Sequence, residues 1–181
     1  MATTRFPAHL TLLTAAALRT TEETAPLQLG LRPVPSDGPR DTLTGVATRQ
    51  SLLEQIERIG DLAPAAPLSF VVVKLQGLDR LNRISGWRAG DETLCVVARA
   101  VQDLTRATDM VGRLSGSAFG VILQGSGATA AGAVAERIGH HLRRLTCVAN
   151  PVQAIVSVAT GTGINADTLP VAAIDSFLNC G

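Results

Sequence analysis

A valine-rich apolar run at residues 68–75 constrains the fold more than any other segment of the chain. Runs of this length and composition are typical of strands buried inside a sheet. Apolar residues at helical spacing precede the run at residues 48–59 and follow it at residues 78–84 and 89–105. A buried strand flanked in sequence by helical segments indicates helices layered on a sheet.

The second half of the chain adds a hairpin, a helix and a strand. Two short strands are expected at residues 110–114 and 119–123, and the small polar turn between them predicts a β-hairpin. A helix is expected at residues 128–145 and a strand at residues 152–160. The order helix–strand–helix–helix–strand–strand–helix–strand predicts an α/β sandwich with a mixed sheet.

The chain divides into an N-terminal extension and one domain. Residues 1–20 are expected to form a short apolar helix, and the prolines and glycines of residues 21–40 indicate a linker. The domain is expected to span residues 41–181, with Thr48 as the N-cap of its first helix and a short final helix at residues 169–178.

The composition excludes several classes of protein. Hydrophobic residues make up 46% of the chain, which is enough for a core, and the net charge of +1 gives no general field for nucleic acid. No apolar run reaches the roughly 18 residues of a membrane-spanning helix. The three cysteines lack metal-type spacing, so buried or free thiols in a reducing cytoplasm are expected.

Residues 106–119 carry the most informative motif, with the sequence RATDMVGRLSGSAF. An Arg-x-x-Asp element, formed by Arg106 and Asp109, precedes the turn of the hairpin. This segment resembles the signature region of the diguanylate cyclase family, the GGDEF domains. The segments DTLTGVATR at residues 41–49 and GWRAGD at residues 86–91 resemble two further motifs of that family, in the same order along the chain.

The resemblance implies a palm-like α/β domain whose mixed sheet is wrapped by helices. Enzymes of the family join two GTP molecules into cyclic di-GMP. Two divalent cations activate the 3′-hydroxyl and neutralise the triphosphate charge, and binding these cations requires clustered acidic oxygens. Here Lys74 and Gln76 on the buried strand, and Ser117 and Ala118 in the hairpin, stand where the family carries acids. We therefore expect no catalytic residues, no metal site and no cofactor.

The positions that bind the reaction product in the family carry matching residue types in this chain. Arg106, Asp109 and Arg137 match the three residues that, by the resemblance, bind an intercalated dimer of cyclic di-GMP. An arginine fork suits guanine O6 and N7 or a phosphate, and an aspartate accepts from guanine N1–H and N2–H. The alternative interpretation is an unused ancestral site or a surface ion pair.

Asn82 and Asp91 match the family residues that contact the substrate guanine, so residual guanine binding is expected there. Each has a structural alternative, because Asn82 can cap a local turn and Asp91 can be the N-cap of the long helix or favour its start through the helix dipole. Trp87 replaces a family histidine and is expected to fill the emptied nucleotide pocket rather than to expose a stacking surface.

Other polar clusters are expected to be solvated surface. Arg80, Arg83 and Arg88 crowd one short stretch, and a role in binding anions or partners is the alternative. His140 and His141 are adjacent on a helix and point apart, which disfavours a metal site. The family's closing strand is missing after residue 160, so an open sheet edge is expected, suited to a second copy or a partner protein.

These observations predict a non-catalytic, cytoplasmic receptor for cyclic di-GMP that signals through dimerisation or partner docking. The main alternative is a scaffold that binds no nucleotide and pairs with an active cyclase or synthase, and an enzyme of altered specificity is a remote third reading. Arg106, Asp109 and Arg137 are the residues that separate the first two.

Overall fold

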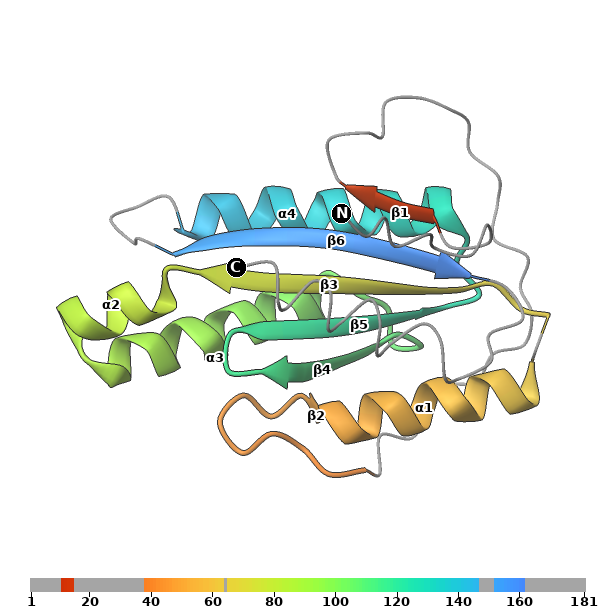
Figure 1. Cartoon of the computed structure of the whole chain (residues 1–181), viewed down its shortest axis with the longest axis horizontal. Coiled ribbons are helices and arrows are strands. Elements are labelled where there is room, and N and C mark those ends of the chain that lie inside the picture. The colour runs from red at the N-terminus through yellow and green to blue at the C-terminus, as the bar shows by residue number, and fades with distance from the viewer. Residues whose placement is uncertain (1–10, 15–37, 64, 147–151, 162–181) are drawn as a thin grey trace, which may run out of the picture.

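The computed structural model describes residues 11–14, 38–63, 65–146 and 152–161. Its elements follow the chain in the order β1 (Thr11–Thr14), β2 (Ala47–Thr48), α1 (Arg49–Leu62), β3 (Leu68–Gln76), α2 (Leu78–Ser85), α3 (Trp87–Asp103), β4 (Met110–Ser115), β5 (Ala118–Gln124), α4 (Ala128–Thr146) and β6 (Gln153–Gly161). The strands form one sheet in the order β1-β6-β3-β5-β4-β2 (Figure 1).

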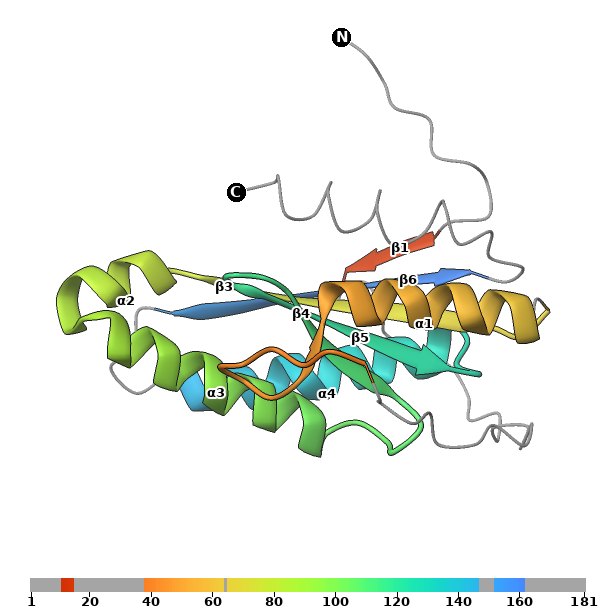
Figure 2. The same ribbon diagram turned by 90° about the horizontal axis from the view of Figure 1, so that it is seen from below.

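The sheet is mixed, which confirms the fold class predicted from the sequence. β2 pairs with β4 in parallel, whereas β3 pairs with β5 and β6, β4 with β5, and β1 with β6 in antiparallel register. β3 therefore lies in the interior of the sheet, as its valine-rich sequence predicts. Helix α1 covers one face of the sheet, and α3 and α4 cover the other (Figure 2).

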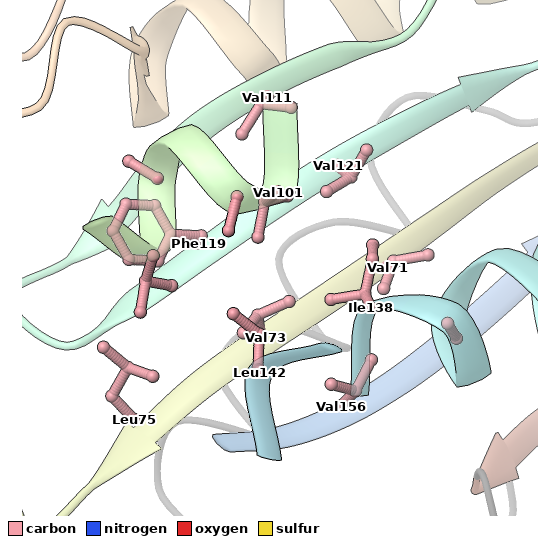
Figure 3. Close-up of a cluster of buried hydrophobic side chains, with 14 of the residues drawn as sticks. Val71, Val73, Leu75, Val101, Val111, Phe119, Val121, Ile138, Leu142 and Val156 are labelled. Atoms are coloured by element: carbon pink, nitrogen blue, oxygen red, sulfur yellow. The ribbon is translucent and has the colours of Figure 1, made fainter. Parts of the chain in front are cut away.

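The alternation of side chains along β3 divides the core into two layers. Val71, Val73 and Leu75 pack toward α3 and α4, together with Phe119 and Ile138 (Figure 3). The alternate residues of β3 face the other way, and Phe70 and Val72 pack with Leu52 and Ile56 of α1. Both faces of the strand are covered, which is why its sequence is apolar at successive positions rather than at every second one.

Local signals set the helix boundaries. Thr48 is the N-cap of α1, where its Oγ1 accepts a hydrogen bond from the backbone amide of Ser51 at 3.2 Å. Gly86 has a φ of 84° between α2 and α3, a conformation that favours glycine and lets the chain turn sharply from one helix into the next. The predicted helices and strands between residues 48 and 160 are all present, with boundaries shifted by at most three residues.

Two expectations for the termini are corrected. Residues 11–14, expected within a helix, form strand β1, because the free edge of β6 offers backbone partners from Ser157 to Thr160. The edge of β6 that was expected to be open is therefore covered over these four pairs. The remainder of the expected N-terminal helix, residues 21–37 of the linker and the expected helix at residues 169–178 lie outside the described residues.

Within the described residues, no helix combines the length and the apolar character needed to cross a lipid bilayer.

Candidate nucleotide-binding site

The two ends of the β4–β5 hairpin carry two different sets of candidate residues. The hairpin closes at Ser117 and Ala118, on the side of the sheet where β3 leads into α2 (Figure 1). Arg106 and Asp109 directly precede β4 and so lie at the opposite, open end of the hairpin. Ser117 and Ala118, which stand where the family resemblance places catalytic acids, are therefore separated from the Arg-x-x-Asp element by the length of the hairpin.

At the closed end, Lys74 lies directly opposite Ala118 in the antiparallel pairing of β3 with β5. Ala118 is fully buried in the apolar layer beneath α1, and Gln76 is exposed at the end of β3. The carbonyl of Ser117 accepts a hydrogen bond from the amide of Leu75 at 2.8 Å. Among the described residues, no cluster of three or more histidine, cysteine or acidic side chains is suited to a metal ion.

Asn82 and Asp91 come from consecutive helices, α2 and α3. The side chain of Asn82 packs so closely against Gly90 that a Cβ added there would lie 3.0 Å from Asn82 Cγ. Asn82 Oδ1 is buried and has no hydrogen-bond partner, so this oxygen caps no backbone amide. Asp91 is exposed in the second turn of α3, whose N-cap is Gly86, so Asp91 is not the N-cap either.

Trp87 does not fill a pocket. Its side chain is 77% exposed at the first residue of α3, and Ile84 near the end of α2 is 67% exposed. The expectation that the ring occupies an emptied nucleotide site is wrong, because the turn at Gly86 directs it to solvent. The neighbouring arginines Arg80, Arg83 and Arg88 are exposed as expected, and Arg88 Nε contacts Glu92 Oε1 at 3.0 Å.

At the open end of the hairpin, Arg106 to Asp109 form a tight turn. The amide of Asp109 donates to the carbonyl of Arg106 at 3.0 Å, and the amide of Arg106 donates to Asp109 Oδ2 at 2.9 Å. Aspartate stabilises such turns because its short side chain reaches a nearby backbone amide. The element therefore holds its own carboxylate in a fixed position at the start of β4.

The charges of Arg106 and Arg137 both act on Asp109, so the structure brings the three residues together. Burial raises the pKa of Asp109 above its ordinary value. Backbone hydrogen bonds from Arg106 and Gln124 and the charges of the two arginines lower this pKa but do not offset the burial. A half-buried carboxylate within the electrostatic reach of two arginines is suited to a ligand that donates N–H groups and carries phosphate.

Arg137 reaches this position from α4. One of its Nη2 hydrogens is donated to the carbonyl of Leu104 at 2.7 Å. Leu104 is the C-cap of α3, and its carbonyl belongs to the negative end of that helix. The contact fixes the guanidinium beside the Arg-x-x-Asp turn, and an arginine has five N–H donors in all, so donors remain for a ligand.

A groove of about 800 Å³ adjoins Arg137 along the exposed face of α4. It runs past His140, His141 and Arg143, and Leu104 lies on its other side. Both histidines are exposed, as expected from their sequence. The groove itself was not anticipated, although the spacing of Arg137 and His140, three residues apart on one helix, is the signal that could have indicated it.

Sequence reasoning also missed the contacts of Arg113 with Asp41, Ser115 and Gly116, which we call the bracket. Its guanidinium donates to the carbonyl of Gly116 at 3.0 Å and to that of Ser115 at 3.2 Å, and its Nη1 lies 3.2 Å from Asp41 Oδ1. Thr44 also donates to Asp41, through its amide at 2.9 Å and its hydroxyl at 2.6 Å. The bracket ties the hairpin turn to the loop before β2, and the 72 residues between its ends hide it from local patterns.

Comparison with known proteins agrees with the fold and the motifs. Residues 39–171 match the family model described as "Diguanylate cyclase, GGDEF domain". The chain is 28% identical over 107 residues to the probable diguanylate cyclase DgcT of Escherichia coli, which covers 59% of this chain and 24% of DgcT. It spans about a quarter or less of the length of the curated relatives it matches.

Solved structures of similar fold include the diguanylate cyclase SiaD of Pseudomonas aeruginosa in complex with its activator SiaC. It has a TM-score of 0.58 and 27% identity over 67% of this chain and 48% of SiaD. The GGDEF domain of DgcB from Caulobacter crescentus, in complex with cyclic di-GMP, has a TM-score of 0.56 and 19% identity over 71% of this chain and 78% of that domain. The family model covers well over half of the residues, and the chain belongs to the family of GGDEF domains.

Proposed function

We propose that this chain is a non-catalytic receptor for cyclic di-GMP, which it binds through Arg106, Asp109 and Arg137. The observation that carries the proposal is the position of Asp109, half-buried at the start of β4 and subject to the charges of both arginines. A surface ion pair alone would need only one arginine. Two positively charged side chains acting on one carboxylate leave an excess of positive charge that an anionic ligand can neutralise.

Each residue has a role that follows from its chemistry. The Asp109 carboxylate accepts from N1–H and N2–H of a guanine, which selects guanine over adenine. Arg106 is exposed and donates to a phosphate or to guanine O6 and N7. Arg137, held at the end of α3 by its bond to Leu104, donates its remaining N–H groups to the same ligand. An intercalated dimer of cyclic di-GMP presents both phosphates and guanine edges to such a surface.

We propose that cyclase activity is absent because Lys74 and Ala118 face each other where the family resemblance places metal-binding acids. An ammonium group repels Mg²⁺, and a buried methyl group offers it no oxygen. Gln76 and Ser117 contribute only neutral oxygens at the neighbouring positions. The groups that would neutralise a triphosphate through metal ions are therefore replaced together.

A second candidate function is a scaffold that docks a cyclase or synthase without a nucleotide. Trp87 and Ile84, which are both exposed and lie three residues apart at the junction of α2 and α3, favour it, because exposed tryptophan with nearby arginines is typical of binding hot spots. The complex of SiaD with its activator SiaC is an example of protein docking in a similar domain. In the receptor proposal, the same surface serves a partner or a second copy in the cytoplasm when the dinucleotide is bound.

Calorimetric titration of the purified chain with cyclic di-GMP tests the proposal, with GTP as the comparison ligand. We expect saturable binding of cyclic di-GMP in the micromolar range or tighter and at least about tenfold weaker binding of GTP. The absence of any heat at roughly 100 micromolar ligand would exclude the receptor function and leave the scaffold as the better explanation.

A further inference from the structure

The groove along α4 adjoins the proposed cyclic di-GMP site, because Arg137 is part of both. Arg137 belongs both to the cluster around Asp109 and to the wall of the groove. Leu104, which accepts the hydrogen bond of Arg137, forms the facing wall and lies two residues before Arg106. The groove volume of about 800 Å³ lies in the range of small-molecule sites. The groove therefore offers space into which a ligand held by Arg106, Asp109 and Arg137 can extend past Arg137.

The groove carries a row of basic groups beyond Arg137. His140 and Arg143 follow it on α4 by three and six residues, which places them about 4.5 Å and 9 Å further along the helix axis. His141 is the next lining residue, and Glu136 is the acid among the lining side chains. A row of donors, rather than a single cationic point, is what a ligand with two separated phosphates requires.

Arg143 is directed back along the helix. A Cβ added at Gly139 would lie 3.4 Å from Arg143 Nη1, so the guanidinium lies against the glycine, one helical turn before its own backbone. The absence of a side chain at Gly139 provides the room for this conformation. Leu104 and Ala133 supply apolar surface beside the cations, which suits the face of a purine.

We infer that His140 and Arg143 contact the second phosphate of the cyclic dinucleotide, in the groove that α4 forms beside Arg137. This inference rests on the proposed function, because it assigns further contacts to the same ligand. In this arrangement, two parts of one site contact different groups of the ligand. The Arg-x-x-Asp turn reads a guanine edge and the first phosphate, and the groove holds the second phosphate through an imidazole N–H and a guanidinium.

The test measures the affinity of the full chain for cyclic di-GMP in the variants His140→Ala and Arg143→Ala. Arg144→Ala is the matched control, because Arg144 is an exposed arginine on the same helix that does not line the groove. We expect each groove variant to bind about 3- to 10-fold more weakly than the control, with a shallower dependence of affinity on salt. Thermal unfolding of all three variants checks that the fold is retained.

The outcomes separate the inference from the proposed function. If wild type binds cyclic di-GMP and both groove variants match Arg144→Ala, the groove does not hold the ligand and this inference is wrong, although the receptor function stands. If wild type shows no binding, the receptor function fails and the assignment of groove contacts fails with it. Weakened binding in Arg143→Ala and His140→Ala but not in Arg144→Ala supports the inference.

Discussion

Lys74 and Ala118 are cross-strand neighbours at the closed end of the β4–β5 hairpin, where β3 pairs with β5. Directly paired residues project from the same face, so the ammonium group of Lys74 and the methyl group of Ala118 share one environment. Ala118 continues the apolar layer of Phe70, Val72 and Leu52 to the edge of this environment. The two positions at which the family resemblance places metal-binding acids therefore carry an ammonium group and a buried methyl group.

The first prediction is that the purified chain produces no cyclic di-GMP from GTP with Mg²⁺ or Mn²⁺. Carboxylates are required to hold either metal, and Lys74 and Ala118 provide none. Chromatography of the reaction mixture measures the product, with an active GGDEF cyclase as the positive control. Steady production that Asn82→Ala or Asp91→Ala abolishes would show that a working active site remains.

The second prediction uses Trp87, the single tryptophan of the chain, as a probe. Trp87 is at the first residue of α3 and Arg106 follows its last, so the 17-residue helix separates them by roughly 25 Å. Saturation with cyclic di-GMP should leave the emission of the exposed indole unchanged in the monomer. A guanine nucleotide bound beside Asn82 and Asp91 would quench this emission. Quenching by cyclic di-GMP would place the ligand near the first turn of α3 and contradict the site proposed at Arg106.

The third prediction concerns stability and the bracket between Asp41 and Arg113. Burial raises the pKa of Asp41, but hydrogen bonds from Thr44 and the ion pair with Arg113 outweigh burial, so the pKa lies below its ordinary value of 3.8. A carboxyl group with a lowered pKa stabilises the fold above its unfolded pKa and loses this contribution as the pH falls through the folded pKa. Asp41→Asn should reduce the free energy of unfolding by about 2 kcal/mol near neutral pH.

Urea unfolding at several pH values checks this prediction, with Asp61→Asn, an exposed aspartate on α1, as the control. The difference between wild type and Asp41→Asn should shrink as the pH falls from the ordinary pKa of 3.8 through the lower folded pKa, because the wild-type carboxyl becomes protonated over this range. A difference that is independent of pH would mean that the charge of Asp41 does not contribute.

The fourth prediction separates stability from binding at Asp109. Burial raises the pKa of this carboxyl, so the folded chain holds its proton more tightly than the unfolded chain does. Acidification toward the unfolded pKa therefore favours the wild-type fold, and the charged form is disfavoured at neutral pH. Asp109→Asn should be as stable as wild type or more stable at neutral pH, and this advantage should decrease in acid.

The same variant should bind cyclic di-GMP at least about tenfold more weakly, because an amide presents one acceptor in place of two to the guanine N–H groups. Stability that is retained while affinity is lost is the pattern of a functional residue held at some cost to the fold. An Asp109→Asn protein that is less stable but binds normally would assign Asp109 a purely structural role.

Much of the domain follows from local sequence patterns. The valine-rich run of β3, the turn at Ser115 to Ser117 and the N-cap at Thr48 each depend on neighbouring residues, and each was predicted correctly. Arg106, Asp109 and Arg137 could be chosen from the sequence as candidate binding residues because the family motifs fix their spacing. Their convergence depends on packing α4 against the sheet beside α3, which the order of elements predicts.

The features that were missed depend on partners far away in sequence. β1 and the two-residue β2 exist only through pairing with β6 and β4, so no local periodicity marks them. The contact between Arg113 and Asp41 joins residues 72 positions apart. Trp87 was assigned to a pocket on the basis of its hydrophobicity, but the direction of the chain after Gly86 decides its exposure.

The most direct test of the receptor account is the affinity of the double variant Arg106→Ala, Arg137→Ala for cyclic di-GMP, measured by calorimetry. Arg58→Ala is the control, because Arg58 is exposed on α1, on the opposite face of the sheet. The account predicts that Arg58→Ala binds like wild type and that the double variant binds about 30- to 1000-fold more weakly, through the loss of charged, forked contacts. Equal affinities in wild type and the double variant would contradict it.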